Sequence, residues 1–254
     1  MGLKTVEKAL DVFTCIAQEN VPVSTTELSK KMGINQTTMS RLLNTLKNRD
    51  FLEQDASTRH YRLGPAMAEM ARAVHRSLDG LVTKKAIPFI KSLRDMLGET
   101  IALEVISGHH IYHAYVADSL NPVSLRVAPG DRVMPHAHVG SKAIVAFSDS
   151  DMIDFWLSQN LPRYTNNTVT EPEQLRKSYE QILKNGIAYD YGEYIEEINA
   201  IGAPIFNHQN KPVAGIAIAV ISLKKRKNWN QHYILQLKKT ANAISSCLHS
   251  SRKI

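Results

Sequence analysis

The sequence lacks the features of exported, membrane-spanning and redox-active proteins. Its 254 residues include two cysteines, Cys15 and Cys247, which lie far apart and form no CxxC motif. Two such thiols favour core packing in a reducing compartment over metal binding or redox chemistry. The longest uncharged apolar run, residues 213–223, is too short to cross a membrane, and residues 1–4 do not resemble an export signal. We therefore expect a cytoplasmic protein with no membrane partner.

Internal repeats and low-complexity segments are also absent, and the composition is that of an ordinary globular protein. Hydrophobic residues make up 43% of the chain and charged residues 22%, which excludes disordered and fibrous classes. The net charge of +7 favours a polyanionic partner. Part of the excess lies in the basic run 224–227, for which a solvated loop is a better interpretation than a DNA contact. The length allows two domains.

Residues 5–63 have the pattern of a winged helix-turn-helix. Apolar residues at spacings of three and four predict a first amphipathic helix. Ser24, followed three residues later by Glu27, forms the capping box that begins a second short helix. Gly33 then supplies a left-handed residue for the turn, and Asn35 can cap a third helix.

The third helix is expected to have one buried and one exposed face. We expect its core face to consist of Ile34, Thr38, Leu42, Leu43 and Leu46. The remaining side chains are of types that contact bases and phosphates, namely Gln36, Thr37, Ser40, Arg41 and Asn44. A two-stranded wing follows, with strands beginning near Phe51 and His60 and with Arg59 at the tip of the turn between them.

This segment predicts double-stranded DNA as a partner. We expect contacts to bases in the major groove from Gln36, Thr37, Ser40 and Arg41. We expect contacts to phosphates from Thr25, Thr26, Lys47 and Arg59. The alternative is a packed module that mediates protein contacts. Net charge does not discriminate between the two, because residues 1–63 hold nine Lys or Arg against seven Asp or Glu.

The rest of the chain predicts a linker helix and then a domain of mixed helices and strands. Pro65 can begin a helix rich in Ala and Met, which could also pack on a second copy of the chain. Further helices are expected at 82–97, with a bend at Pro88, and at 141–147, 149–159, 173–185 and 230–249. Strands are expected at 100–106, 111–116, 123–127, 200–206 and 213–222.

The predicted fold class is therefore α+β, with antiparallel strands flanked by helices. We divide the chain into a winged helix-turn-helix domain (1–64), a linker helix (65–79) and a domain of the kind that holds a small molecule between sheet and loops (80–254).

Taken in order, these segments resemble the IclR family of bacterial transcriptional regulators over nearly the whole chain. Any single segment is weak evidence, whereas their ordered series is specific. The segments that carry the resemblance are the helix-turn-helix 25–52, the wing end 61–64, and residues 97–100, 130–132, 135–137, 141–143, 160–165, 167–170, 186–190 with Glu193, and 201–205.

The resemblance implies a ligand-responsive repressor or activator of a catabolic pathway. It further implies a pseudo-palindromic operator, a homodimer or dimer of dimers, and a GAF-like domain that senses a small organic acid, with no cofactor. The effector pocket of the family lies between a helix start, the stretch around Asp190 and the two C-terminal strands. Carried onto this sequence, the effector-binding residues are His136, His138, Gly140, Ser141, Lys142, Asp190, Ala200, Ala217 and Ala219. Free N–H groups at a helix start can hold a carboxylate.

The sequence departs from the family pattern inside this pocket. Ser141 stands where the family usually has Gly, and Gly140 stands where a larger apolar residue is usual. Ala200 replaces a frequent Cys, and Ala217 and Ala219 replace residues that often carry hydroxyls. Because these changes remove a thiol and two hydroxyls, we expect an effector with a larger apolar body, such as an aromatic or longer acid.

An enzyme is the alternative. His136 and His138 form an HxH pair that could bind zinc with Asp190 or Glu193, giving a metal-dependent small-molecule enzyme fused to a winged helix. We favour a ligand-contacting or structural role for the pair and expect neither a metal nor catalysis. Ser141 lacks a nucleophile elbow, and the Gly-Ser-Lys order at 140–142 is not that of a phosphate loop. The effector, the operator, the regulated genes, the sign of regulation and the oligomer size are not encoded in a recognisable form.

Overall fold

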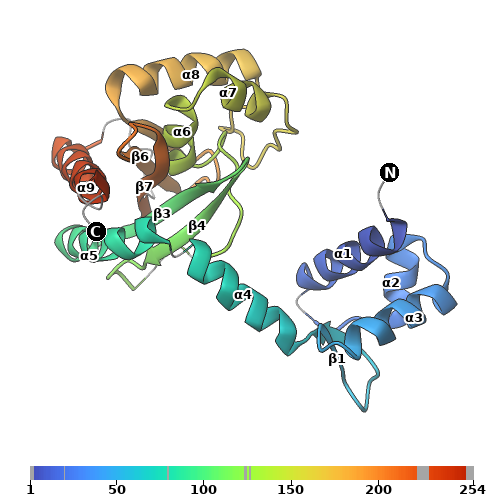
Figure 1. The fold of residues 1–254 in the computed structure, drawn as a ribbon. Coiled ribbons are helices and arrows are strands. Elements are labelled where there is room, and N and C mark those ends of the chain that lie inside the picture. The colour runs from blue at the N-terminus through green and yellow to red at the C-terminus, as the bar shows by residue number, and fades with distance from the viewer. Residues whose placement is uncertain are drawn as a thin grey trace. The chain divides into compact units, whose positions relative to one another are not determined.

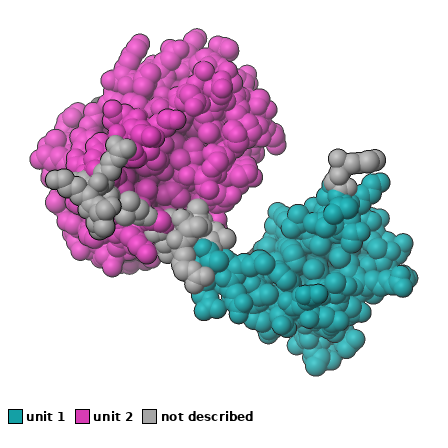
Figure 2. Space-filling model, viewed as in Figure 1, with its two compact units in different colours: residues 1–76 teal, residues 77–254 magenta. Residues whose placement is uncertain are grey.

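The computed structural model describes residues 3–19, 21–78, 80–122, 125, 127–221 and 229–249, without the side chains of 74–78 and 81. The chain divides into two compact units, residues 1–76 and residues 77–254 (Figure 2). Each unit has its own hydrophobic core. None of the helices in the described ranges combines the length and the apolar character that a membrane crossing requires.

The first unit is a winged helix-turn-helix. Its elements are α1 (Lys4–Ala17), α2 (Thr25–Met32), α3 (Gln36–Lys47), β1 (Leu52–Gln54) and β2 (Tyr61–Leu63), followed by α4 (Pro65–Leu78). The wing strands β1 and β2 pair antiparallel. Val23 exchanges two backbone hydrogen bonds with Tyr61, of 2.9 and 2.8 Å, and so ties the segment before α2 to the wing. The core of the unit is Val12, Ile16, Val23, Leu28, Met39, Leu43, Leu52 and Tyr61.

The local hydrogen bonds of this unit agree with the sequence. The Ser24 hydroxyl accepts from the Glu27 N–H, and the Glu27 carboxylate accepts from the Ser24 N–H, which is the predicted capping box. Gly33 adopts a φ of 62° at the end of α2. The Asn35 side chain accepts from the N–H of Thr38 at 2.8 Å and so caps α3.

One prediction for α3 was wrong. Thr38 is exposed, and Met39 is fully buried in its place. The reason is the position of Thr38 in the first turn, where its backbone is held by the Asn35 cap and its side chain faces solvent. Met39 and Leu43, four residues apart, form the innermost row of the helix.

The second unit is built on a five-stranded antiparallel sheet of order β4-β3-β7-β6-β5. Its strands are β3 (Thr100–Ser107), β4 (His110–Ala117), β5 (Ala188–Tyr191), β6 (Ile198–Phe206) and β7 (Pro212–Ile221). Its helices are α5 (Leu81–Leu97), α6 (Val139–Ala146), α7 (Ser150–Leu157), α8 (Pro172–Asn185) and α9 (Gln231–His249). Figure 1 shows α5 and α9 on one side of this sheet and α6, α7 and α8 on the other.

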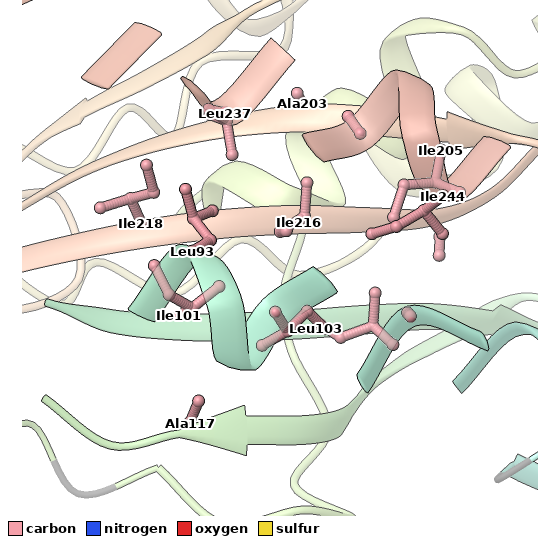
Figure 3. Packing of buried hydrophobic residues seen from close by; sticks show 14 of the residues in the cluster. Leu93, Ile101, Leu103, Ala117, Ala203, Ile205, Ile216, Ile218, Leu237 and Ile244 are labelled. Carbon is pink, nitrogen blue, oxygen red and sulfur yellow. The ribbon is translucent and has the colours of Figure 1, made fainter. Parts of the chain in front are cut away.

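Both faces of the sheet are buried, because successive strand residues alternate between two cores. Ile101, Leu103, Ile216 and Ile218 face α5 and α9, where they meet Leu93, Leu237 and Ile244 (Figure 3). Ala102, Ala200 and Ala217 belong to the second core with residues of α6, α7 and α8. The large side chains thus lie on one face of the central strands and small ones on the other.

Three details of the second unit differ from the sequence prediction. The helix expected at 141–147 begins two residues earlier, so that Gly140 lies inside α6 and not in a turn before it. The short strand β5 was not predicted. Residues 123, 124 and 126 of the strand expected at 123–127 lie outside the described residues, and neither Leu125 nor Val127 is in a strand. Gly98 ends α5 with a φ of 72°, directly after the last residue of the helix expected at 82–97.

Candidate functional site

The exposed face of α3 presents polar side chains that its buried face holds in place. The exposed or partly exposed side chains are Gln36, Thr37, Ser40, Arg41 and Asn44. Behind them, Met39 and Leu43 are fully buried against the rest of the unit. The face is therefore polar, free of large apolar groups and carried by a rigid helix.

The start of α2 lies beside the start of α3. The Gln36 side-chain amide donates a hydrogen bond of 3.1 Å to the Thr26 hydroxyl. A polar groove runs from these two helix starts to the wing, and Thr25, Ser40 and Arg59 are among the residues that line it. Four of the eight residues predicted to contact DNA line this groove, namely Thr25, Thr26, Ser40 and Arg59. Gln36 adjoins it through its bond to Thr26, Thr37 and Arg41 are exposed on α3, and Lys47 lies elsewhere.

The wing turn is rigid although it is exposed. The Asp55 carboxylate accepts hydrogen bonds from the N–H groups and hydroxyls of Ser57 and Thr58. These bonds hold the pKa of Asp55 well below its usual range. Arg59 follows in the left-handed conformation, with a φ of 60°, and its side chain is exposed at the turn.

Two basic residues near the wing already have protein partners. The Lys47 ammonium donates to the Gln54 side chain at 3.3 Å, and the Gln54 amide in turn donates to the Arg59 carbonyl at 3.0 Å. Arg62 forms an ion pair of 2.7 Å with Glu53 on the opposite wing strand. Lys47 thus braces the wing, and the charge of Arg62 is locally compensated.

The second unit contains a pocket of about 100 Å³ on the α6 side of the sheet. Small residues in two register rows form its floor. Asp190, Ala200, Ala219 and Thr100 are successive neighbours across β5, β6, β7 and β3. In the next row Ala217 pairs with Ala102. Because these side chains are short, space remains above them.

The helix α6 closes one end of this floor by lying directly on the strands. A Cβ atom at Gly202 would come within 2.4 Å of the Val139 carbonyl oxygen, and one at Gly215 within 2.2 Å of the Gly140 carbonyl oxygen. Only glycine therefore permits this close approach of the helix backbone to β6 and β7. As a result every residue of α6 is buried.

Glu104 lies at the junction of the pocket with the start of α6. It is 2% exposed, lines the pocket and stands opposite Gly215 in the register of β3 and β7. A Cβ at Gly140 would lie 2.8 Å from its carboxyl carbon, so the absence of a side chain at Gly140 makes room for the carboxyl group. Burial raises the pKa of Glu104 to about 7, although the neighbouring donors of Ser141 and Gly140 act in the opposite direction.

A buried ion pair holds the segment that follows β5. The Lys142 ammonium lies 2.6 Å from the Glu193 carboxylate, and the two side chains are 3% and 13% exposed. The Asp190 carboxylate accepts from the Glu193 N–H at 2.6 Å. The Thr168 hydroxyl donates to the Glu193 carbonyl, also at 2.6 Å. Burial raises the pKa of Asp190 to about 7, against the attraction of Lys142.

The histidines near the pocket are largely buried, and their rings point in different directions. Burial lowers the pKa of His113 to about 4 and that of His138 to about 3, so both are neutral at pH 7. Their ring centroids are 5.8 Å apart, and both line the pocket. His136 instead points to the Pro162 carbonyl, with 2.8 Å between its Nε2 and that oxygen.

The predicted effector residues fall into two groups in the structure. Those that line the pocket are His138, Asp190, Ala200, Ala217 and Ala219. Those that do not line it are His136, Gly140, Ser141 and Lys142, which pack around its α6 end. The Ser141 hydroxyl is used within the helix, where it donates to the His138 carbonyl at 3.0 Å. The Lys142 ammonium is paired with the Glu193 carboxylate.

Sequence reasoning missed six polar residues that line the pocket, namely Thr100, Glu104, His113, Asp131, Arg132 and Tyr194. Glu104 had a detectable signal, because a charged residue inside an otherwise apolar strand is unusual. His113 was not predicted to belong to the pocket. The described residues contain no group of three or more His, Cys, Asp or Glu side chains placed to hold a metal ion.

Comparisons with known proteins identify both parts of the chain. Residues 5–56 match the IclR helix-turn-helix domain, and residues 74–246 match the bacterial transcriptional regulator IclR C-terminal domain. The HTH-type transcriptional regulator BhcR of Paracoccus denitrificans is 29% identical over 224 residues, which cover 88% of this chain and 79% of that protein.

Solved structures agree on the fold. The Thermotoga maritima IclR crystal structure has a TM-score of 0.74 at 24% identity, covering 97% of this chain and 99% of that one. An IclR homolog from Microbacterium hydrocarbonoxydans, crystallised in complex with 4-hydroxybenzoate, has a TM-score of 0.78 at 18% identity, covering 96% of this chain and 98% of that one. At these identities the likeness establishes the fold alone.

Proposed function

The chain belongs to the IclR family of bacterial transcriptional regulators, and on that premise we propose which of its residues recognise DNA and which recognise the effector. It is a ligand-responsive, DNA-binding regulator of a catabolic pathway. The matched domains and the reported relatives are regulators, not enzymes, so the metal-dependent enzyme has no support. Its DNA target implies that it works in the cytoplasm.

For DNA recognition we propose that α3 enters the major groove. The polar, exposed face of this helix is the observation that carries the proposal, because Gln36, Thr37, Ser40 and Arg41 are types that contact base edges. Thr25, Thr26 and Arg59 would contact phosphates, since they lie at the same groove as the exposed face. Lys47 would add a phosphate contact while it braces the wing through Gln54.

For the effector we propose a small organic acid with an aromatic or longer apolar body. Ala200, Ala217 and Ala219 make the central part of the floor apolar, in place of thiol and hydroxyl groups, which favours a flat or extended apolar group. Arg132 lines the pocket with an exposed side chain and is a suitable partner for a carboxylate. The structural relative bound to 4-hydroxybenzoate supports an acid of this class.

Several of the predicted effector-binding residues would influence the effector indirectly, by positioning other residues. We propose that Lys142 keeps the segment after β5 against the pocket by its ion pair with Glu193, so that Tyr194 and Asp190 keep their places. Gly140 and Ser141 would act by setting the position of α6 on the sheet. His136 would support the wall through its hydrogen bond to Pro162.

We propose a homodimer or dimer of dimers, with residues 65–79 as the linker helix between domains 1–64 and 80–254. A pseudo-palindromic operator requires two copies of α3, and the Ala- and Met-rich sequence of α4 is suited to packing on a second copy. In this arrangement a change in the effector domain alters the spacing of the two recognition helices through α4.

The first experiment is selection of bound duplexes from a random DNA pool at about 150 mM salt, where non-specific electrostatic binding is suppressed. Enrichment of an inverted repeat would support the dimeric regulator and supply a probe. Release of that probe by aromatic acids then tests the effector class. Enrichment of no sequence, with and without such acids, would overturn the proposal that α3 recognises bases.

A further inference from the structure

Glu104 is a buried acid whose role the proposed function does not explain. Its side chain lines the pocket and is 98% removed from solvent. Among the residues that the structure describes, none forms a hydrogen bond with its Oε2 atom. A buried carboxyl oxygen without a partner costs free energy, and an apolar residue of the same size would avoid this cost. A ligand donor that enters the pocket would satisfy it.

The carboxyl group of Glu104 occupies the start of α6. The position of a Cβ at Gly140 lies 2.9 Å from its Oε1 and 3.0 Å from its Oε2, so the carboxyl group rests on the first turn of the helix. The unpaired N–H groups of a first turn attract a negative charge. In this chain a carboxylate of the protein itself takes that place, which leaves no room there for the carboxylate of an effector.

The inner part of the pocket holds a second carboxyl group and a neutral histidine ring. Asp190 lies on the floor, 4% exposed. The Nδ1 atom of His113 is buried and has no hydrogen-bond partner within the described part of the chain. Arg132 and its neighbour Asp131 line the same pocket and are exposed, so the solvent side holds a cation beside an acidic group. A ligand that matches this arrangement has a hydrogen-bond donor at its inner end and an anionic group at its outer end.

We propose that Glu104 accepts a hydrogen bond from a hydroxyl or amino group of the effector, and that the effector carboxylate lies toward Arg132. The effector is then an aromatic acid that carries a donor at the end of its ring far from the carboxylate. This orientation is the reverse of the one expected from the helix start. The inference rests on the proposed effector class and narrows it to acids with a distal donor.

The test is calorimetric binding of two matched probes, 4-hydroxybenzoate and benzoate, to the full chain at pH 8, where Glu104 is largely ionised. We expect the hydroxylated probe to bind at least about tenfold more tightly, because a site built to bond a hydroxyl discriminates strongly against its absence. In Glu104→Leu this preference should vanish. Glu180→Gln removes one negative charge from the exposed face of α8 and should keep the preference.

Glu104→Gln keeps the size of the side chain and provides a second test in case Glu104→Leu does not fold. Because hydrogen bonds to charged groups are stronger than those to neutral ones, the preference should fall by about threefold or more. Binding of both probes with equal affinity to the wild-type protein would overturn the role of Glu104 and leave the aromatic effector standing. Failure of both probes to bind would overturn the aromatic effector itself, and this inference with it.

Discussion

The polar side chains on the exposed face of α3 are in contact with water, whereas most of those around the pocket are buried. A substitution on α3 therefore tests DNA contacts, and one at the pocket tests packing as well. Arg41 is exposed and takes part in none of the ion pairs in the described part of the first unit. Its loss would therefore change DNA contacts and leave packing intact. Glu104 is buried without a partner for one oxygen, so its replacement changes stability as well as binding.

Arg41→Ala should cost about 1 to 3 kcal/mol of operator binding and relax the preference at one base pair. Lys47→Ala should weaken binding to all sequences alike, because a phosphate contact carries no sequence information. Arg62→Ala is the matched control, since Glu53 already neutralises this arginine, and we expect almost no change. Affinities for a series of single-base operator variants check all three. Uniform losses for both Arg41→Ala and Lys47→Ala would contradict base recognition by Arg41.

The raised pKa of Glu104, about 7, predicts a pH-dependent difference between the wild-type protein and Glu104→Gln. The unfolded chain ionises this acid near its usual pKa, so the folded protein binds more protons between roughly pH 4 and pH 7. The wild-type protein should lose stability relative to the variant as the pH rises through that window, by up to about 3 kcal/mol. Urea unfolding of both proteins at pH 5 and pH 8 measures this difference. An unchanged difference would show that Glu104 is solvated.

At the scale of elements, the position of α6 depends on glycines in three different places. Gly202 and Gly215 bring its backbone onto β6 and β7, and Gly140 brings its first turn onto the Glu104 carboxyl group. The helix has no acidic residue in its first turn and no side-chain cap. Close packing therefore holds the helix against the sheet. Glu104 provides the acceptor that a capping side chain would otherwise supply.

Gly140→Ala should displace the Glu104 carboxyl group, because the new methyl group would stand 2.8 Å from its carboxyl carbon. We expect a loss of about 1 to 3 kcal/mol in the free energy of unfolding, as for other overpacked sites. Glu104→Ala in the same chain should recover most of this loss. A double-mutant cycle by urea unfolding gives the coupling directly. Additive effects of the two substitutions would mean that the two residues do not share this space.

At the scale of the whole molecule, regulation requires that effector binding and operator binding change one another. The two units each have a separate core, and residues 65–78 form the helix that follows the wing. Because this helix leads along the chain from one unit to the other, we expect it to take part in coupling between the pocket and α3. The coupling free energy is the same whether it is measured as the effect of the effector on operator binding or as the effect of the operator on effector binding.

An acid that lowers operator affinity by a given factor should bind the DNA-free protein more tightly than the operator complex by the same factor. Calorimetric titration of the acid into the free protein and into the complex measures this factor. Operator affinity measured with and without saturating acid provides the reciprocal value. Unequal factors would indicate that the acid changes the oligomeric state as well as the conformation.

The sequence by itself determined the elements whose signals are local. The capping box at Ser24, the left-handed Gly33 and the Asn35 cap each depend on neighbours within four residues, so their pattern was enough to predict them. Most strands and helices of the second unit followed from apolar periodicity. The ordered motifs were enough to identify the family.

Only the tertiary structure decided which residues meet at the pocket. Glu104 reaches the start of α6 because β3 pairs with β7 in a register that sets it opposite Gly215, and Gly140 lies over that same glycine. These contacts join residues more than thirty positions apart, and no local pattern encodes such a register. Because this register could not be predicted, the helix start at 140–142 was expected to face the effector. In the structure the carboxyl group beside it is that of Glu104.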